Sequence, residues 1–284
     1  MAKLLSGKDV AQALTVSMKQ DVEALRAKGI TPTLGIIRVG EKGPDISYEK
    51  GATKRCEEVG AAVKNYRLPE DTTQQALLEV IREANEDPAV HGILLFRPLP
   101  KHIDDNVVRA ALLPKKDMDG ITDGSMAGIY ADTNQGYAPC TAESVIKILD
   151  HYQIDPAGKR VVVVGRSTVI GKPVSLLLLK KNGTVTIGHS KTKDISSVIR
   201  EADIVVVAMG RAESVGKESF RSGQVVVDVG VNPKPDGSKG TCGDVKFAEV
   251  EPLVEAISPV PGGVGSVTSC MLISHVIRAA QGSI

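Results

Sequence analysis

The chain has 284 residues and a formal net charge of +1, which suits one large or two ordinary domains. A nearly balanced charge argues against a general nucleic-acid binder, and 3% aromatic residues without Trp provide no stacking platform for single strands. No apolar run reaches about 18 residues, and the N-terminus has no apolar signal-peptide core. We therefore expect a cytoplasmic protein with no membrane or nucleic-acid partner.

The first half of the chain alternates helical and strand patterns, as in an α/β layer with a mostly parallel sheet. Helical spacing of apolar residues predicts a helix over 10–28 that stops at Gly29. The other predicted elements are strands at 33–39, 61–66 and 92–96 and helices at 46–59 and 73–85. Residues 115–139, rich in Gly, Asp, Asn and Thr, are interpreted as the rim of an active site and the crossing between domains.

The second half repeats the alternation and predicts a Rossmann-type domain. Thr141 can cap a helix that runs through 146–152. Strands are predicted at 161–164, 184–187, 204–208 and 225–229, and a last helix at 269–280 is expected to pack back on the first domain. The predicted fold class is therefore α/β with two domains. The first comprises residues 1–140 with 262–284 packing back on it, and the second comprises residues 141–261.

Four cysteines stand far apart in the sequence: Cys56, Cys140, Cys242 and Cys270. None belongs to a C-x-x-C pair, and the spacing fits neither a zinc site nor a small disulfide framework. We interpret them as reduced, partly buried thiols and predict no metal site.

Residues 158–173 predict a nucleotide-binding turn. The four valines at 161–164 are typical of a buried parallel strand, which Gly165 ends before a helix begins. Such a turn presents backbone N–H groups and a helix dipole to a phosphate. Against the dinucleotide pattern G-x-G-x-x-G, Gly165 fits the first position, Ser167 occupies the second and Gly171 comes one residue late. A glycine-terminated strand without a nucleotide is the alternative.

The loop after the next strand indicates which dinucleotide fits. NAD-selective sites place an Asp or Glu about 20 residues on, to hold the ribose hydroxyls. Residues 188–193 read GHSKTK and contain no acid. Ser190, the lysines of this loop and Arg166 would suit an extra phosphate on the ribose, so NADP is favoured over NAD. The alternative is a solvated basic loop.

Near the C-terminus, residues 258–268 read SPVPGGVGSVT. Two prolines and three glycines make a stiff bend followed by bare backbone, on which a planar ligand can lie. A purely structural turn is the alternative.

This last segment resembles the P-V-P-G-G-V-G-P-M-T motif of the methylenetetrahydrofolate dehydrogenase/cyclohydrolase family, and six further motifs agree in order. Residues 227–232 resemble I-D-V-G-I-N, and 243–245 resemble G-D-V. The other four similar segments are 116–120 (K-D-V-D-G), 139–141 (P-C-T), 165–173 (G-R-S-x-x-V-G-x-P) and 189–192 (H-S-x-T). The resemblance covers essentially the whole chain.

The resemblance implies a homodimeric enzyme of one-carbon folate metabolism. A hydride would pass from 5,10-methylenetetrahydrofolate to NADP, and the family's cyclohydrolase activity would open the methenyl product to 10-formyltetrahydrofolate. In the family the substrate lies between the two domains. The residues implied in folate binding or catalysis are Tyr48, Lys54, Pro98, Leu99, Asp119, Pro261, Gly262 and Gly263. Those implied in NADP binding are Gly165, Arg166, Ser167, Gly171, Ser190, Val231 and Thr268. A carboxylate at Asp119 can accept two hydrogen bonds from the pterin edge.

The chain departs from the family at the residues that the family uses to activate water in the cyclohydrolase step. The family's substrate helix carries Y-x-x-x-K and a second lysine two residues later; Tyr48 falls on the tyrosine, Ala52 on the catalytic lysine and Lys54 on the second lysine. On a regular helix Lys54 lies about 240° round from Tyr48, unless Gly51 allows a local shift. Phe96 replaces a glutamine, and Arg97 adds a charge that could serve the same site. We therefore expect dehydrogenase activity and leave cyclohydrolase activity open.

Two smaller departures follow. Residues 121–125 differ from the family's F-H-P-x-N, and Ser266 replaces a proline. Two rival functions remain: another two-domain dehydrogenase acting on a small acid, and a nonenzymatic NADP-binding protein. The first predicts no folate binding, and the second predicts cofactor binding without turnover.

Overall fold

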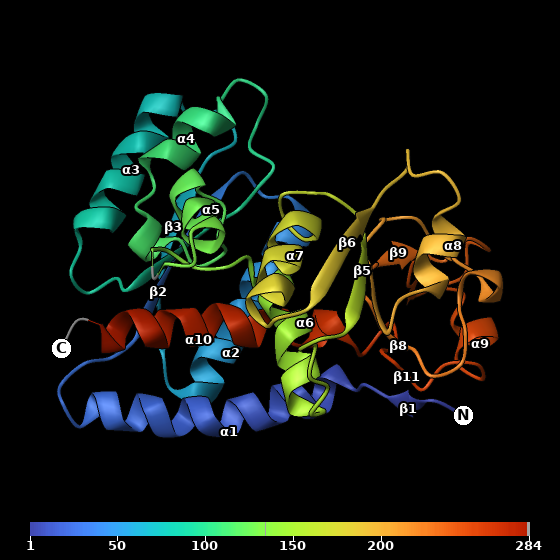
Figure 1. The fold of residues 1–284 in the computed structure, drawn as a ribbon. Coiled ribbons are helices and arrows are strands. Elements are labelled where there is room, and N and C mark those ends of the chain that lie inside the picture. Colours follow the sequence, from blue (N-terminus) through green and yellow to red (C-terminus); the bar gives the residue numbers. More distant parts are fainter. Residues whose placement is uncertain (134, 283–284) are drawn as a thin grey trace. The chain divides into compact units, whose positions relative to one another are not determined.

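The computed structural model describes residues 1–133 and 135–282 and divides into two compact units (Figure 1). The six-stranded unit comprises Met1–Gln12 and Thr141–Thr268, and the three-stranded unit comprises Ala13–Cys140 and Ser269–Ile284. This division differs from the expected domain limits at two places. Residues 1–12 and 262–268 were expected with the first half of the chain, and both belong to the six-stranded unit.

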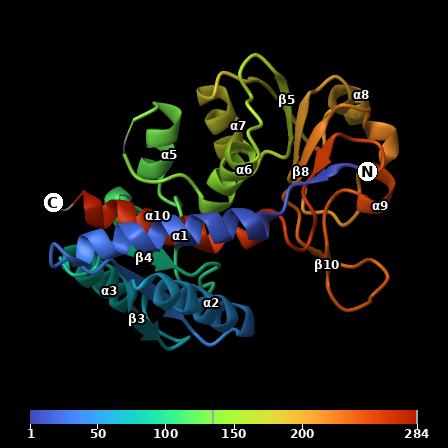
Figure 2. The same cartoon turned by 90° about the horizontal axis from the view of Figure 1, so that it is seen from below.

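The three-stranded unit is built on a parallel sheet in the order β3-β2-β4. The strands are β2 (Thr33–Val39), β3 (Ala62–Leu68) and β4 (Gly92–Leu95). Its helices are the larger part of α1 (Gly7–Arg26), α2 (Gly43–Val59), α3 (Gln74–Glu86), α4 (Asp105–Ala111), η1 (Pro114–Lys116), α5 (Asp123–Tyr130) and nearly all of α10 (Thr268–Gln281). Figures 1 and 2 both show α10 running beside α1, and most α10 side chains are buried.

Local sequence signals explain where these helices begin and end. Thr73, Asp104 and Thr122 cap α3, α4 and α5, each accepting a hydrogen bond from a backbone N–H of the first turn. Gly60 ends α2 at φ 85°, a left-handed conformation that glycine adopts without a steric penalty. No helix was predicted within residues 115–139, but Asp123–Tyr130 form α5, because the Thr122 cap starts a helix in a segment with little apolar periodicity.

The six-stranded unit carries a sheet in the order β1-β11-β8-β7-β5-β6, with every pairing parallel. The strands are β1 (Lys3–Leu4), β5 (Arg160–Val164), β6 (Thr184–Gly188), β7 (Ile204–Val207), β8 (Val225–Asp228) and β11 (Ala256–Ile257); β9 (Asn232–Pro233) and β10 (Thr241–Cys242) form a separate hairpin. The helices are α6 (Cys140–His151), α7 (Gly171–Lys180), α8 (Ile195–Arg200), η2 (Lys217–Ser219), α9 (Phe247–Val250) and η3 (Val264–Ser266).

The core of this unit explains its sequence pattern. The valines of β5, β7 and β8 are buried on both faces of the sheet, so these strands show continuous apolar runs rather than alternation. β1 and β11 were not predicted because two-residue strands carry no periodicity. Among residues 1–133 and 135–282, no helix is long and apolar enough to cross a membrane.

Candidate active site

The glycine turn after β5 lies at the point where the strand order of the six-stranded sheet reverses. β6 follows β5 in the chain and pairs on one side of it, whereas β7 pairs on the other. A crevice forms at the carboxyl ends of the strands at such a point, and nucleotides bind there. A Cβ on Gly165 would stand 2.3 Å from the Ala208 oxygen, and one on Gly171 would stand 2.2 Å from the Gly165 oxygen. Both glycines are therefore required for the turn to close.

The turn leaves Arg166 and Ser167 exposed ahead of α7. The Ser167 hydroxyl accepts a hydrogen bond from Ile170 N at 3.1 Å, which shapes the approach to the helix. Val164 pairs with Gly188 in register, and Gly165 N donates to the Gly188 oxygen at 2.9 Å. Since Arg166 and Ser190 each follow this paired position by two residues, they leave adjacent strand ends. Ser190 is exposed there, so the predicted ribose-phosphate pair lies on neighbouring loops.

Two buried aspartates organise the loops after β7 and β8. Asp228 accepts hydrogen bonds from the N–H groups of Gly230, Asp244 and Val245. Asp244 accepts four more hydrogen bonds, from Met209 N, Gly210 N, Arg211 N and Asn232 Nδ2. Burial and, to a smaller extent, the charge of Asp244 raise the pKa of Asp228 to about 7. The three N–H donors act in the opposite direction and lower this pKa. Val231, a predicted cofactor contact, projects from the loop these carboxyls hold and is 62% exposed.

The glycine-rich segment near the C-terminus packs against the first residue of α1. Gly7 N donates to the Gly262 oxygen at 2.8 Å, and a Cβ on Gly7 would stand 1.9 Å from the Gly263 oxygen. Pro261 is exposed and Gly262 is half-buried with φ 102°. Thr268 begins α10 and donates to the Gly265 oxygen at 3.1 Å. These predicted contact residues therefore all lie in the six-stranded unit, on one bend that packs against Gly7.

In the three-stranded unit, the side chains of residues 116–120, which read K-D-M-D-G, have different structural roles. Lys116 Nζ donates to the oxygens of Ala84 and Asp87 at the end of α3. Asp117, fully buried, accepts from Thr122 N and Ser125 Oγ, both at 2.7 Å, and so holds the start of α5. These two side chains are structural, which leaves Asp119 as the carboxyl available for a ligand.

Asp119 is partly buried and lies in the electrostatic environment of Tyr48. Burial and the charge of Asp117 raise the pKa of Asp119, whereas hydrogen bonds from Cys140 and the electrostatic effect of His275 act in the opposite direction. Burial, Asp119 and Cys140 raise the pKa of Tyr48 above its ordinary value. A raised pKa keeps the Tyr48 side chain, which is 39% exposed, a neutral phenol at neutral pH.

Helix α2 is continuous through Gly51, so Lys54 keeps the regular helical angle from Tyr48. Ala52, four residues beyond Tyr48, is 2% exposed, whereas Lys54 is exposed to solvent. Buried Glu49 accepts from Arg38 Nε at 2.6 Å and from Arg67 Nε at 3.0 Å, which ties α2 to β2 and β3. The rotation of α2 is thereby set, and no local shift turns Lys54 toward Tyr48.

The end of β4 carries the second departure from the family. The Phe96 ring packs edge-on against Tyr48, with ring centroids 5.7 Å apart at 85°. Arg97 donates from Nε to Asp105 Oδ1 at 2.6 Å and from Nη2 to Oδ2, a bidentate pair with the first turn of α4. The charge of Arg97 is therefore already paired with a carboxylate. No sequence motif marks Asp105, because only the fold brings it to Arg97.

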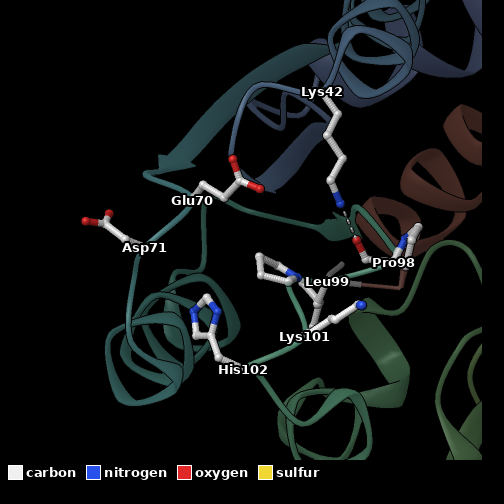
Figure 3. A pocket seen from close by; sticks show the side chains of 8 residues that line it. Lys42, Glu70, Asp71, Pro98, Leu99, Lys101 and His102 are labelled. Carbon is white, nitrogen blue, oxygen red and sulfur yellow. Dashed lines mark hydrogen bonds between the residues drawn. The ribbon is translucent and has the colours of Figure 1, made fainter.

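Pro98 and Leu99 line a cavity of about 910 Å³ within the three-stranded unit (Figure 3). Figure 3 shows Lys42 reaching across from the start of α2, and its Nζ donates to the Pro98 oxygen at 3.0 Å. The cavity is also lined by Glu70, Asp71, Pro100, Lys101 and His102. Lys42 thus joins the loop before the Tyr48 helix to the loop that carries the two predicted substrate contacts.

The fold and the glycine turn at its switch point define a two-unit α/β protein of the dinucleotide-binding class. Comparison with known proteins narrows this class. Residues 5–119 match the family described as "Tetrahydrofolate dehydrogenase/cyclohydrolase, catalytic domain", and residues 139–284 match its "NAD(P)-binding domain". The chain therefore belongs to the tetrahydrofolate dehydrogenase/cyclohydrolase family.

Individual relatives agree over the whole length. The "Bifunctional protein FolD" of Carboxydothermus hydrogenoformans is 47% identical over 281 residues, covering 99% of this chain and 98% of the relative. The crystal structure of the bifunctional FolD enzyme from Campylobacter jejuni is 36% identical, with a TM-score of 0.96 and all of both chains covered. The Trypanosoma brucei enzyme, solved with NADP and an inhibitor, is 35% identical with a TM-score of 0.92, covering 99% of this chain and 98% of that one.

These findings confirm the family resemblance, the α/β fold class with a Rossmann-type domain, and the prediction that the chain is an enzyme. NADP as the cofactor is confirmed through the match to an NAD(P)-binding domain and the similarity to an NADP-bound structure. The closed glycine turn with exposed Arg166 and Ser190 on adjacent loops fits such a cofactor.

Proposed function

We propose that the protein catalyses NADP-dependent oxidation of 5,10-methylenetetrahydrofolate to 5,10-methenyltetrahydrofolate. Membership of the family over both matched domains supports this reaction. The observation that carries the proposal is Asp119: a partly buried carboxyl in the environment of Tyr48, left available because Asp117 and Lys116 take the structural contacts. A carboxylate in this position can accept two hydrogen bonds from the pterin edge.

The bound NADP supplies the hydride acceptor. The chain's own residues bind and orient: Asp119 holds the pterin, Tyr48 packs on the folate, and Pro98 and Leu99 contact it. Pro261, Gly262 and Gly263 offer bare backbone to the same ligand. Hydride transfer depends chiefly on holding two carbons in contact at the right angle, so this set needs no proton-transferring side chain for the dehydrogenase step.

Arg166 and Ser190 hold the ribose phosphate in this proposal, which makes NADP the preferred cofactor. Gly165, Ser167 and Gly171 supply the turn that receives the pyrophosphate. Val231, through its backbone, and Thr268, near the nicotinamide end, are the other contacts with the cofactor in this proposal. Support comes from the register of β5 and β6, which brings Arg166 and Ser190 to adjacent strand ends.

A second candidate is a dehydrogenase that has lost the water-adding cyclohydrolase step. Three observations favour it: the lysine position is Ala52, buried at 2% exposure; Phe96 packs on Tyr48; and Arg97 is paired with Asp105. None of these side chains supplies a proton-transferring group beside Tyr48. Lys54 remains the catalytic candidate for a retained cyclohydrolase, although it is exposed on a regular stretch of α2.

A two-part spectroscopic assay tests both candidates. Methylenetetrahydrofolate with NADP is followed for reduced cofactor, and methenyltetrahydrofolate is followed separately for loss above its uncatalysed rate. Reduced cofactor alone is the result expected of a monofunctional dehydrogenase. Catalysed loss of methenyltetrahydrofolate as well would show that another group activates water. Absence of hydride transfer with both NADP and NAD would refute the proposed function.

We also propose that the enzyme works in the cytoplasm as a homodimer. Four cysteines without a disulfide agree with a reducing compartment. Strand β6 stands at the edge of the six-stranded sheet and exposes Ile187 at 43%. Exposed apolar groups on an edge strand favour association with another chain, and the family resemblance suggests a second copy.

A further inference from the structure

Helix α10 carries a buried histidine that reaches the peptide immediately before Asp119. His275 is 0% exposed, and its Nδ1 lies 2.7 Å from the Met118 oxygen. A carbonyl oxygen can only accept, so Nδ1 carries the proton and donates. The Cys140 thiol donates to the same oxygen at 3.2 Å. A carbonyl oxygen has two lone pairs, and both are therefore engaged.

The opposite side of Met118 is held by the sheet. Its N–H donates to the Ile93 oxygen at 3.3 Å, beside a parallel bridge between Ile93 and Asp117. Its side chain is fully buried, and a Cβ on Gly92 would stand 2.3 Å from the Met118 sulfur. The backbone at Met118 is thus hydrogen-bonded to β4 through its N–H and to α10 through its carbonyl oxygen. Asp119 directly follows this residue in the chain.

The His275 ring is itself fixed by aromatic contacts. It stacks on Tyr137 with centroids 4.9 Å apart and a 32° angle between planes. The Arg278 guanidinium lies over the other ring of this pair, 5.2 Å from the Tyr137 centroid. The ring contact accompanies the orientation in which Nδ1 faces the Met118 oxygen.

We propose that His275 is a positioning residue for the folate-binding carboxylate of Asp119. This inference rests on the proposed function, because it assigns to His275 the placement of the group that holds the pterin. A carboxylate that accepts two parallel hydrogen bonds must be held within about 0.5 Å of its productive position. The His275 donor prevents the 118–119 peptide from rotating. Such a rotation would move the Asp119 carboxylate away from the position in which it accepts both hydrogen bonds.

The test compares three substitutions on α10. His275→Leu removes the donor and keeps an apolar side chain, whereas His275→Asn returns an amide N–H close to the position of Nδ1. Val276→Ala is the matched control: it lies on the same helix, is 0% exposed and takes no part in the hydrogen bonds to Met118. Thermal unfolding, KM for methylenetetrahydrofolate and kcat are measured for each.

We expect His275→Leu to raise KM about tenfold with kcat within about threefold, since loss of one positioning hydrogen bond weakens binding more than hydride transfer. His275→Asn returns KM to within about threefold of the unmodified enzyme. Val276→Ala lowers the unfolding temperature and leaves KM unchanged. An unchanged KM in His275→Leu, an equal rise in Val276→Ala, or no recovery in His275→Asn would overturn the inference.

Asp119→Asn separates failure of this inference from failure of the proposed function. If Asp119→Asn weakens folate binding and His275→Leu does not, only the role of His275 is refuted. If Asp119→Asn leaves folate binding intact, the proposed role of Asp119 is refuted. A KM rise in His275→Leu would then have another cause, so the positioning role would be refuted with it.

Discussion

At the scale of single residues, the two aspartates of the K-D-M-D-G segment show how neighbouring positions divide structure from function. Asp117 satisfies the N–H groups of Ile121 and Thr122 together with the Ser125 hydroxyl. Asp119, two residues on, has its pKa raised by burial and by that same Asp117 charge. The structural aspartate thus helps to raise the pKa of the aspartate that is proposed to bind folate.

The raised pKa of Asp119 predicts how folate binding depends on pH. When the pH falls through that pKa, the carboxyl gains a proton and loses an acceptor, so KM for the folate rises; above it KM is flat. The rise therefore begins above the pH of about 4 at which an ordinary aspartate titrates. Steady-state KM across the acid range measures it. Asp119→Asn should show a high KM that does not vary with pH, and an identical pH profile in this variant would contradict the assignment.

Arg166→Ala tests the proposed contact between Arg166 and the ribose phosphate of NADP. Removing the guanidinium should weaken NADP about tenfold or more and leave NAD within about threefold, because a charge-assisted hydrogen bond contributes roughly 1.5–3 kcal/mol. Dissociation constants for both cofactors measure the difference. Lys172→Ala, on the exposed face of the first turn of α7, is the control. Equal weakening of NADP and NAD would remove the phosphate role.

At the scale of elements, the loops after β7 and β8 are held in place by hydrogen bonds from their N–H groups to two buried carboxyls. Positions 230 and 243 have no room for a side chain. A Cβ on Gly230 would stand 2.4 Å from an Asp244 oxygen, and one on Gly243 would stand 1.9 Å from an Asp228 oxygen. The motifs around positions 228–232 and 243–245 therefore describe one packed arrangement that holds the loops after β7 and β8.

Asp244→Asn should destabilise the protein by about 2–3 kcal/mol, since an amide nitrogen cannot accept and leaves buried N–H donors unpaired. Denaturant unfolding measures this free energy. Asp236→Asn is the control, because Asp236 is exposed and its carboxylate accepts from Ser238 N at 2.9 Å; a change within about 0.5 kcal/mol is expected. Equal effects of the two substitutions would show that the Asp244 network contributes little.

At the scale of the whole molecule, the proposed homodimer can be tested at the edge of the six-stranded sheet. Ile187→Glu places a charge at the exposed apolar position of β6 and should shift the protein from dimer to monomer in sedimentation analysis. Val107→Glu, at a 42% exposed position in the three-stranded unit, should leave the dimer intact. A monomeric unmodified protein, or a dimer in both variants, would refute this interface.

The regular elements could be predicted because their signals are local. Four consecutive valines predict a buried strand wherever the chain goes, and the predicted strand at 33–39 agrees with β2 as observed. The glycine turn at 165–171 was recognised from its glycine spacing after a valine run, whereas the Ala208 oxygen that excludes a Cβ at Gly165 is visible only in the structure. The family's motifs identified the candidate site residues without any knowledge of their contacts.

The sequence by itself therefore determined the α/β class, most helices and strands, and the family. The tertiary structure alone decided which polar groups meet: Arg97 with Asp105, Lys116 with the end of α3, and His275 with Met118, 157 positions away. It also showed that α2 runs unbroken past Gly51 and leaves Lys54 exposed. The physical reason is that periodicity reflects burial along one element, whereas a hydrogen bond between distant residues leaves no periodic trace in the sequence.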